Sequence, residues 1–175
     1  MQERRPVTTL TGESAAVTDR PDRQNGARRL VVAVAIAVAV VLVDQLTKWW
    51  AVDRLPAGPI HVIGTLDLEL SLNTGSAFSM FTGQTALVMA VVFALVGVLL
   101  VMVWRAPTLG RAGILGLILG GALGNLSDRL FRHDHGAVVD FVALHFWPTF
   151  NVADSCVVVG CLLLLVSLMR GSRAR

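Results

Sequence analysis

Residues 30–52 read LVVAVAIAVAVVLVDQLTKWWAV and begin with an unbroken apolar run, Leu30–Val43. At about 1.5 Å per residue, a helix of this length spans the hydrocarbon core of a bilayer, which is about 30 Å thick. Three further apolar segments follow at about residues 85–104, 111–130 and 151–169. The sequence therefore predicts an all-α polytopic membrane protein with four transmembrane helices.

The composition of the whole chain supports a membrane protein. Hydrophobic residues make up 54% and charged residues only 15%, with a mean hydropathy of +0.67. Because soluble domains carry about a quarter charged residues, a soluble enzyme and a disordered chain are both excluded. The net charge of +3 is unevenly placed, so we do not expect nucleic acid as a partner.

The positions of Lys and Arg predict the orientation in the membrane. Most of the 15 lie in a polar tail at residues 1–29, in a loop at 105–111 and at the C-terminal end, which includes residues 171–175. Loops rich in Lys and Arg stay in the cytoplasm, so both termini are expected there. The tail has too little apolar surface to fold and is expected to be disordered. The transmembrane domain then covers residues 30–170.

Two longer loops, residues 53–84 and 131–150, then lie on the outer side. Residues 65–72 alternate strictly between apolar and polar side chains, which is typical of a half-buried strand. A strand needs partners, so we expect a small extracytoplasmic β-sheet on the outer membrane surface. Phe146 and Trp147 are expected to anchor the second loop at the interface.

Carboxylates at the membrane edge are costly and need a physical reason. Asp44 lies at outer-leaflet depth, and Lys48, four residues on, shares its helix face. This pair is either a structural ion pair or a group that orients a nearby site. Asp140 and Asp154 are both embedded in apolar sequence. For Asp154, capping of the last helix is an alternative role, because Asn151 is a good N-cap residue.

The third span combines a packing surface with polar groups at its outer end. Glycine recurs at every fourth position, at Gly116, Gly120 and Gly124. Such a face lets another helix approach closely, so we interpret it as packing. Asn125 and Arg129 share a face near the outer surface, whereas Asp128 beside Arg129 is interpreted as an ordinary exposed charged step.

These polar groups converge on one depth, at the outer leaflet boundary. Two carboxylates that approach closely cannot both ionise cheaply, so one keeps a proton while the other activates water. Asp140 and Asp154 are the expected pair of such an aspartic protease site. Ser155 has no evident base nearby in the sequence. His133 and His135 lack a third ligand at suitable spacing, so no metal site is expected.

Five stretches together resemble the bacterial lipoprotein signal peptidases, also called signal peptidase II. They are DQLTK at 44–48, NTGSAFS at 73–79, GGALGNLSDR at 120–129, VVDF at 138–141 and FNVADS at 150–155. They occur in the family's order and spacing over about residues 30–170. Each stretch alone is a weak signal, and the five in order are a strong one.

The resemblance implies an aspartic endopeptidase without metal or organic cofactor. Such enzymes remove signal peptides from prolipoproteins, cleaving before a cysteine that carries diacylglycerol. The family's catalytic pair corresponds to Asp140 and Asp154. Its supporting residues correspond to Asp44, Lys48, Asn73, Gly75, Ala77, Asn125, Arg129 and Asn151.

The resemblance also implies the setting of the enzyme. It predicts four transmembrane helices with an extracytoplasmic β-cradle and a short helical outer loop. The protein is expected in the bacterial cytoplasmic membrane, with its active site at the outer leaflet face. Its expected partners are diacylglyceryl-modified prolipoproteins and membrane lipids, and we expect a monomer.

Two other functions fit parts of the sequence. A small proton- or ion-coupled transporter would use intramembrane acids as a relay, but these acids cluster at one membrane face. A membrane adaptor that docks partners on the outer sheet would explain the strand at 65–72. It would not explain why Asp140 and Asp154 have apolar surroundings.

Overall fold

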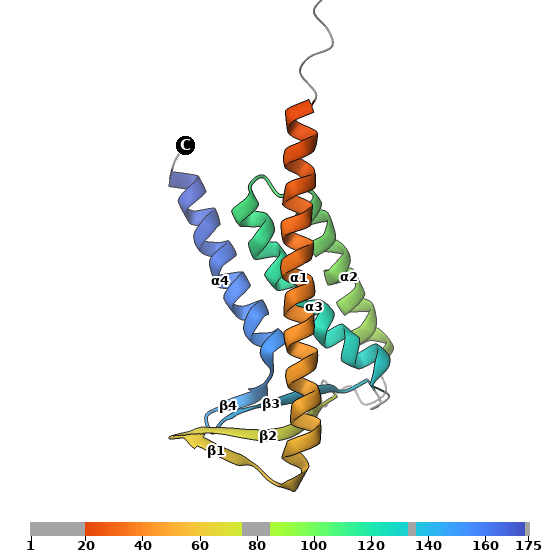
Figure 1. Ribbon diagram of the computed structural model, residues 1–175, viewed down its shortest axis with the longest axis vertical. Helices are drawn as coiled ribbons and strands as arrows, with labels where there is room; N and C mark the ends of the chain where they lie inside the picture. The colour runs from red at the N-terminus through yellow and green to blue at the C-terminus, as the bar shows by residue number, and fades with distance from the viewer. Residues whose placement is uncertain (1–19, 75–84, 133–135, 174–175) are drawn as a thin grey trace, which may run out of the picture.

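The computed structural model describes residues 20–74, 85–132 and 136–173. Four long helices lie side by side with a small sheet at one end of them (Figure 1). The helices are α1 (Arg20–Arg54), α2 (Thr85–Trp104), α3 (Leu109–Phe131) and α4 (Val152–Arg173). Three of them, α1, α3 and α4, are long and apolar enough to cross a membrane, and the described part of α2 is a shorter apolar helix, Met89–Trp104.

The first helix begins earlier than the sequence predicts. α1 starts at Arg20, so residues 20–29, expected to be disordered, belong to the helix. The physical reason is that a helix already nucleated by its apolar turns extends with one hydrogen bond for each further residue. Residues 1–19 of the predicted tail lie outside the described residues.

The sheet at the end of the helices has four antiparallel strands. They are β1 (Ile60–Ile63), β2 (Leu66–Asn73), β3 (Val138–Leu144) and β4 (Trp147–Phe150), in the order β1-β2-β3-β4. β2 confirms the strand predicted from the alternation at 65–72. In the part of the chain that is described, the one short helix is η1 (Leu55–Ala57), which directly continues α1. The helical outer loop implied by the family is thus not found among the described residues.

A bulge in β2 adjusts the side chains that face β3. The register between the two strands shifts between Leu68 and Ser71, after which Ser71 lies opposite Asp140 and Asn73 opposite Val138. An extra residue of this kind re-aims the side chains that follow it. The simple alternation therefore ends early, and Leu72 is exposed.

Apolar contacts fix the sheet to the helices. Ala51 near the end of α1 and Leu55 of η1 are buried against Phe141 of β3. Asp140 precedes Phe141 directly, so this cluster places the strand that carries Asp140 against the end of α1.

The glycine face of α3 packs against α1, as predicted. A Cβ atom added to Gly116 would lie 2.5 Å from the Ala33 carbonyl oxygen. A Cβ atom added to Gly120 would lie 2.7 Å from Val40 Cβ and 2.8 Å from the Ala37 carbonyl oxygen. Real Cβ atoms do not approach so closely, so glycine is required for this helix spacing.

We predict that Gly120→Ala forces α1 and α3 apart and destabilises the protein by about 1–3 kcal/mol. The matched control is Gly110→Ala in the same helix, where an added Cβ meets nothing within 4 Å. Thermal unfolding of the two purified proteins in detergent measures the difference. Equal midpoints for both variants would show that the close approach is not required.

Candidate active site

Polar side chains form one buried cluster where the helices meet the sheet. The described charged or polar residues that are buried, each no more than 1% exposed, are Asp44, Lys48, Asp128, Asp140 and Asn151. They come from α1, α3, β3 and the residue between β4 and α4. The structure therefore brings together segments that are far apart in the sequence.

Asp140 accepts hydrogen bonds from two asparagines. Asn151 Nδ2 donates to Asp140 Oδ1 at 2.7 Å, and Asn73 Nδ2 donates to Asp140 Oδ2 at 3.0 Å. The bulge in β2 makes the second contact possible, because it sets the register of Asn73 against β3.

Asp154 lies in the first turn of α4 and also contacts Asn151. Its Oδ1 accepts from Asn125 Nδ2 at 2.7 Å, and its Oδ2 accepts from the Asn151 backbone N–H at 3.3 Å. In return, the Asp154 backbone N–H donates to Asn151 Oδ1 at 2.9 Å. This reciprocal pair is a helix cap, as the alternative reading of the sequence proposed. Asn151 therefore contacts both carboxylates, capping the helix with Asp154 and donating to Asp140.

The two carboxyl groups have different environments. Asp140 is 1% exposed, whereas Asp154 is only partly buried. Burial raises the pKa of Asp140 from 3.8 to about 6, and the nearby charge of Asp154 acts in the same direction. Hydrogen bonds from Asn73 and Asn151 oppose this shift without cancelling it. Asp140 thus keeps its proton to a higher pH than an ordinary aspartate does.

A buried ion network holds the asparagine that contacts Asp154. Lys48 Nζ lies 2.8 Å from Asp44 Oδ2 and 2.9 Å from Asp128 Oδ2, and all three side chains are fully buried. It also donates to Asn125 Oδ1 at 2.9 Å. An ammonium group only donates, so Asn125 must turn its oxygen to Lys48 and its NH₂ group to Asp154. The pair of Asp44 and Lys48 is therefore an ion pair that also orients the site.

Asp44 connects this network to α4. Its Oδ1 accepts from the Ala153 backbone N–H at 2.9 Å. A Cβ atom added to Gly124 would lie 2.7 Å from Asp44 Oδ2. The third glycine of the α3 face thus makes room for a carboxylate, whereas Gly116 and Gly120 make room for the backbone of α1.

The interpretation of Asp128 as an exposed charge is wrong. Asp128 is 1% exposed, and besides Lys48 it accepts from Gln45 Nε2 at 2.9 Å and Arg132 Nε at 2.8 Å. Its Oδ2 also accepts from the Val139 backbone N–H at 3.1 Å, next to Asp140. The spacing of Asp128 and Arg132, four residues apart on one helix, was the signal that could have indicated an ion pair. Nothing local in the sequence singled out Gln45.

Arg129 supplies positive charge close to the carboxylates. Its Nη1 donates to the Asn125 carbonyl oxygen at 3.4 Å, and its charge interacts with those of Asp154, Asp128 and Asp140. Four other residues considered from the sequence lie outside the described residues: Gly75, Ala77, His133 and His135.

The sequence matches a known family. Residues 36–170 match the family model described as Signal peptidase (SPase) II. The chain belongs to the signal peptidase II family. A "Lipoprotein signal peptidase" of Mycobacterium tuberculosis (strain ATCC 25618 / H37Rv) is 43% identical over 169 residues, covering 92% of this chain and 81% of the relative. Another of Rhodococcus jostii (strain RHA1) is 47% identical over 152 residues, covering 82% and 75%.

Solved structures share the fold of this signal peptidase. Two are described as "Bacterial membrane enzyme structure by the in meso method", at 1.9 Å and 2.3 Å resolution. The first is 27% identical with a TM-score of 0.70 and covers 78% of this chain and 91% of its own. The second is 26% identical with a TM-score of 0.71 and covers 82% and 90%. The family resemblance is confirmed, and the protein is an aspartic peptidase of a bacterial membrane.

The raised pKa of Asp140 predicts a pH-dependent stability. Between the unfolded value of 3.8 and the folded value of about 6, the folded protein binds more protons than the unfolded chain. The contribution of Asp140 to the free energy of unfolding therefore falls as pH rises through this range, by on the order of 3 kcal/mol in total. Above this range the contribution no longer changes with pH. Unfolding midpoints of wild type and Asp140→Asn across this range measure the difference. Parallel pH profiles would contradict the prediction.

Removing the central cation should destabilise the network. In Lys48→Met, Asp44 and Asp128 stay buried without that counter-charge, at an expected cost of about 3–5 kcal/mol. The control is Arg54→Met on the same helix, whose exposed side chain pairs only at the surface, with an expected cost under about 1 kcal/mol. Detergent unfolding compares them, and equal stability of the two variants would refute the supporting role of Lys48.

Proposed function

We propose that this signal peptidase removes signal peptides from diacylglyceryl-modified prolipoproteins, using water activated between Asp140 and Asp154. The observation that carries the proposal is Asn151, which hydrogen bonds to both carboxylates at once. Relatives named lipoprotein signal peptidases, 43% and 47% identical, support the substrate class. No step of this mechanism requires a metal or organic cofactor.

The different environments of the two carboxyls suggest their roles. Asp140, with its pKa raised to about 6, holds the shared proton, and the more exposed Asp154 acts as the base. Asp154 takes a proton from the water, whose oxygen attacks the scissile carbonyl carbon. Asp140 then gives its proton to the leaving nitrogen as the C–N bond breaks. Each turnover exchanges the proton between the two groups, which therefore act as one pair.

We assign stabilisation of the developing oxyanion to Arg129. The amide of Asn125 is engaged at both ends, by Lys48 at its oxygen and Asp154 at its NH₂ group. Arg129 lies in the field of the same carboxylates and carries a permanent charge. Asp44, Lys48, Asn73, Asn125 and Asn151 then serve as positioning residues, and Gly75 and Ala77 are proposed to support the site from the loop after β2.

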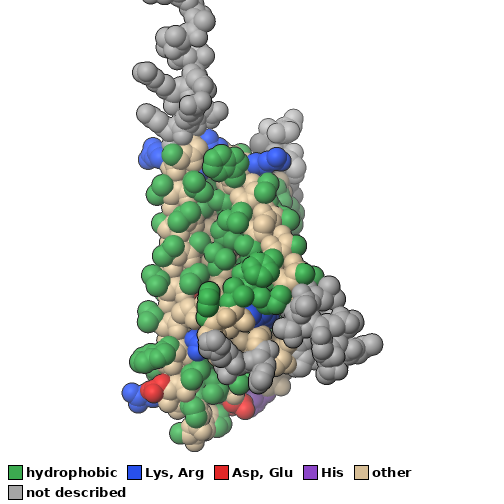
Figure 2. Space-filling view, turned by 90° about the vertical axis from the view of Figure 1, so that its right-hand side faces the viewer, with side chains coloured by type: hydrophobic (Ala, Val, Ile, Leu, Met, Phe, Trp, Pro, Cys, Tyr) green, Lys and Arg blue, Asp and Glu red, His purple; other side chains and the backbone are tan. Residues whose placement is uncertain are grey.

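The proposed orientation has α2 as a fourth membrane crossing and both termini in the cytoplasm. The sheet, whose strand β3 carries Asp140, lies at one end of the helices (Figure 1), and Lys and Arg side chains gather at the other end (Figure 2). Phe146 and Trp147 are both exposed at the turn between β3 and β4, where an interfacial anchor would lie. The peptidase domain then extends from α1 through α4 and acts as a monomer at the outer leaflet.

Ion-coupled transport has no comparable support. The buried carboxylates of the described residues are Asp44, Asp128 and Asp140, and all lie in the half of the molecule that holds the sheet. A relay would need such groups along the length of the helices.

Cleavage of a diacylglyceryl-modified prolipoprotein by the purified protein tests the proposal. We expect wild type to cut the lipidated substrate and not its unlipidated form. Asp140→Asn and Asp154→Asn should each lower kcat by about 10³-fold or more, because each variant lacks one of the two proton transfers. Asp53→Asn is the control, since its side chain is 60% exposed at the end of α1, and it should retain full activity. Turnover by either dyad variant at the wild-type rate would refute the assignment.

A further inference from the structure

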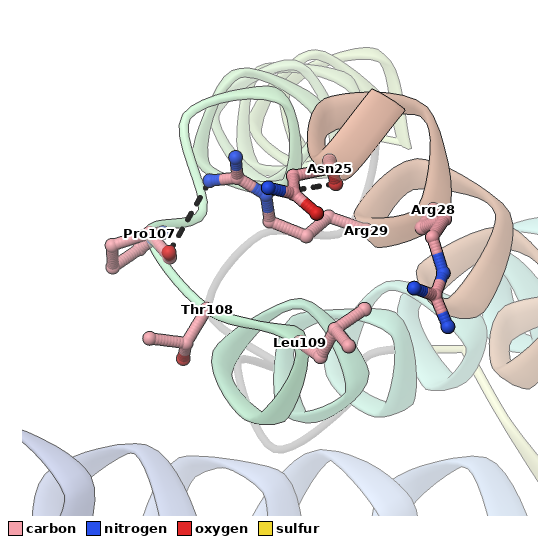
Figure 3. Close-up of a pocket in the computed structure, with 6 residues that line it drawn as sticks. All are labelled: Asn25, Arg28, Arg29, Pro107, Thr108 and Leu109. Carbon is pink, nitrogen blue, oxygen red and sulfur yellow. Dashed lines mark hydrogen bonds between the residues drawn. The ribbon is translucent and has the colours of Figure 1, made fainter. Parts of the chain in front are cut away.

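A pocket lies at the end of the helices opposite the sheet (Figure 3). Its lining comes from the beginning of α1 and from the connection between α2 and α3, and comprises Asn25, Arg28, Arg29, Pro107, Thr108 and Leu109. None of these residues belongs to the candidate active site, so this pocket needs its own explanation.

Hydrogen bonds hold the two walls of the pocket together. Arg29 Nη1 donates to the carbonyl oxygens of Ala106, at 2.9 Å, and Pro107, at 3.2 Å. Arg29 Nε donates to the Asn25 carbonyl oxygen at 3.0 Å. Figure 3 shows the Arg29 guanidinium between the start of α1 and the loop. These hydrogen bonds therefore fix the position of α1 relative to the loop that forms the other wall of the pocket.

The chemistry of the lining suits an anion. Arg28 contributes an exposed guanidinium, which forms strong paired hydrogen bonds with phosphate oxygens. Thr108 is the N-cap of α3, and its side chain accepts from the Arg111 backbone N–H at 3.2 Å. The first N–H groups and the dipole of α3 thus add positive potential on the opposite wall.

The described charged side chains around the pocket are all positive. Among residues whose side chains the structure describes, this end of the helices carries Arg28, Arg29, Arg105, Arg111 and Arg170. The first acidic side chain that the structure describes is Asp44, well along α1. An anionic ligand at this end therefore meets no described carboxylate.

The depth of the pocket points to a lipid as the source of the anion. The apolar run of α1 begins at Leu30, directly after Arg28 and Arg29 of the pocket lining. Leu109 of the pocket lining is exposed, as are Leu30 and Val31, which follow Arg29. Figure 2 shows a broad hydrophobic surface that reaches up to Lys and Arg side chains at this end. A phospholipid matches both features, with its phosphate among the guanidinium groups and its acyl chains along the apolar helices.

We propose that this pocket binds the phosphate of an anionic phospholipid in the membrane leaflet at this end of the helices. Basic pockets between transmembrane helices are known to recognise such head groups. The lipid would bridge α1 and the loop before α3, which Arg29 already joins. The proposal is independent of the peptidase chemistry, because the pocket shares no residue with the site.

Native mass spectrometry of the full-length protein in neutral detergent tests this site. The probes are phosphatidylglycerol, phosphatidylcholine and inorganic phosphate. We expect one phosphatidylglycerol to bind in preference to phosphatidylcholine, and Arg28→Gln to weaken it about fivefold, the effect of one cation near an anionic lipid. Arg28→Lys should keep most of the affinity. Arg170→Gln, an exposed arginine at the same end outside the pocket, should change it less than about twofold.

Three results would overturn the proposal. Equal weakening by Arg28→Gln and Arg170→Gln would mean that diffuse charge attracts the lipid without a specific pocket. Binding of phosphatidylglycerol that is unchanged in Arg28→Gln would place the lipid elsewhere. Occupancy by inorganic phosphate as strong as by the lipid would show a site for free anions. Because Arg28 is exposed, its substitution is expected to leave folding intact, and cleavage activity confirms this in each variant.

Discussion

The ammonium group of Lys48, fully buried between two carboxylates, is the interaction on which the site depends. A buried charge is costly unless paired, so Asp44 and Asp128 must come together around it. These two residues lie on different helices, and their meeting fixes α1 against α3. The third contact of Lys48 orients Asn125, whose NH₂ group then holds Asp154. The position of a proposed catalytic carboxylate thus follows from a buried ion network of other residues.

Small residues make this network possible. Gly124 leaves the space that the carboxylate of Asp44 occupies, and Gly116 and Gly120 bring α1 close enough to reach it. On the sheet side, the bulge in β2 brings Asn73 to Asp140. Helix packing and strand register therefore act on the same site. There Asn151 contacts Asp140 through its side chain and Asp154 through its backbone N–H.

Much of this arrangement follows from local sequence. Apolar length predicts the four long helices, and alternation predicts β2, because both properties depend on residues near one another in the chain. Asp140 and Asp154 stand out for the same reason, as acids in apolar surroundings. The start of α1 at Arg20 was missed because composition alone does not show how far a formed helix extends.

The burial of Asp128 could not be predicted locally, since its partners Lys48, Gln45 and Val139 come from other elements. Leu72 illustrates the same limit, because its exposure follows from a bulge defined by pairing with β3. The role of a residue with distant partners can be assigned only from the folded structure. A residue that is unusual among its sequence neighbours can be recognised from the sequence alone.

The central claim is that Asp140 and Asp154 share a proton. Infrared titration of the protonated carboxyl band in the purified protein tests this most directly. The account predicts a band that is absent in Asp140→Asn and that disappears in wild type near pH 6, the pKa of buried Asp140. In Asp154→Asn the band should disappear at lower pH, because the neighbouring negative charge is gone. A wild-type band already lost near pH 4, or one whose titration is unchanged in Asp154→Asn, would contradict a shared proton.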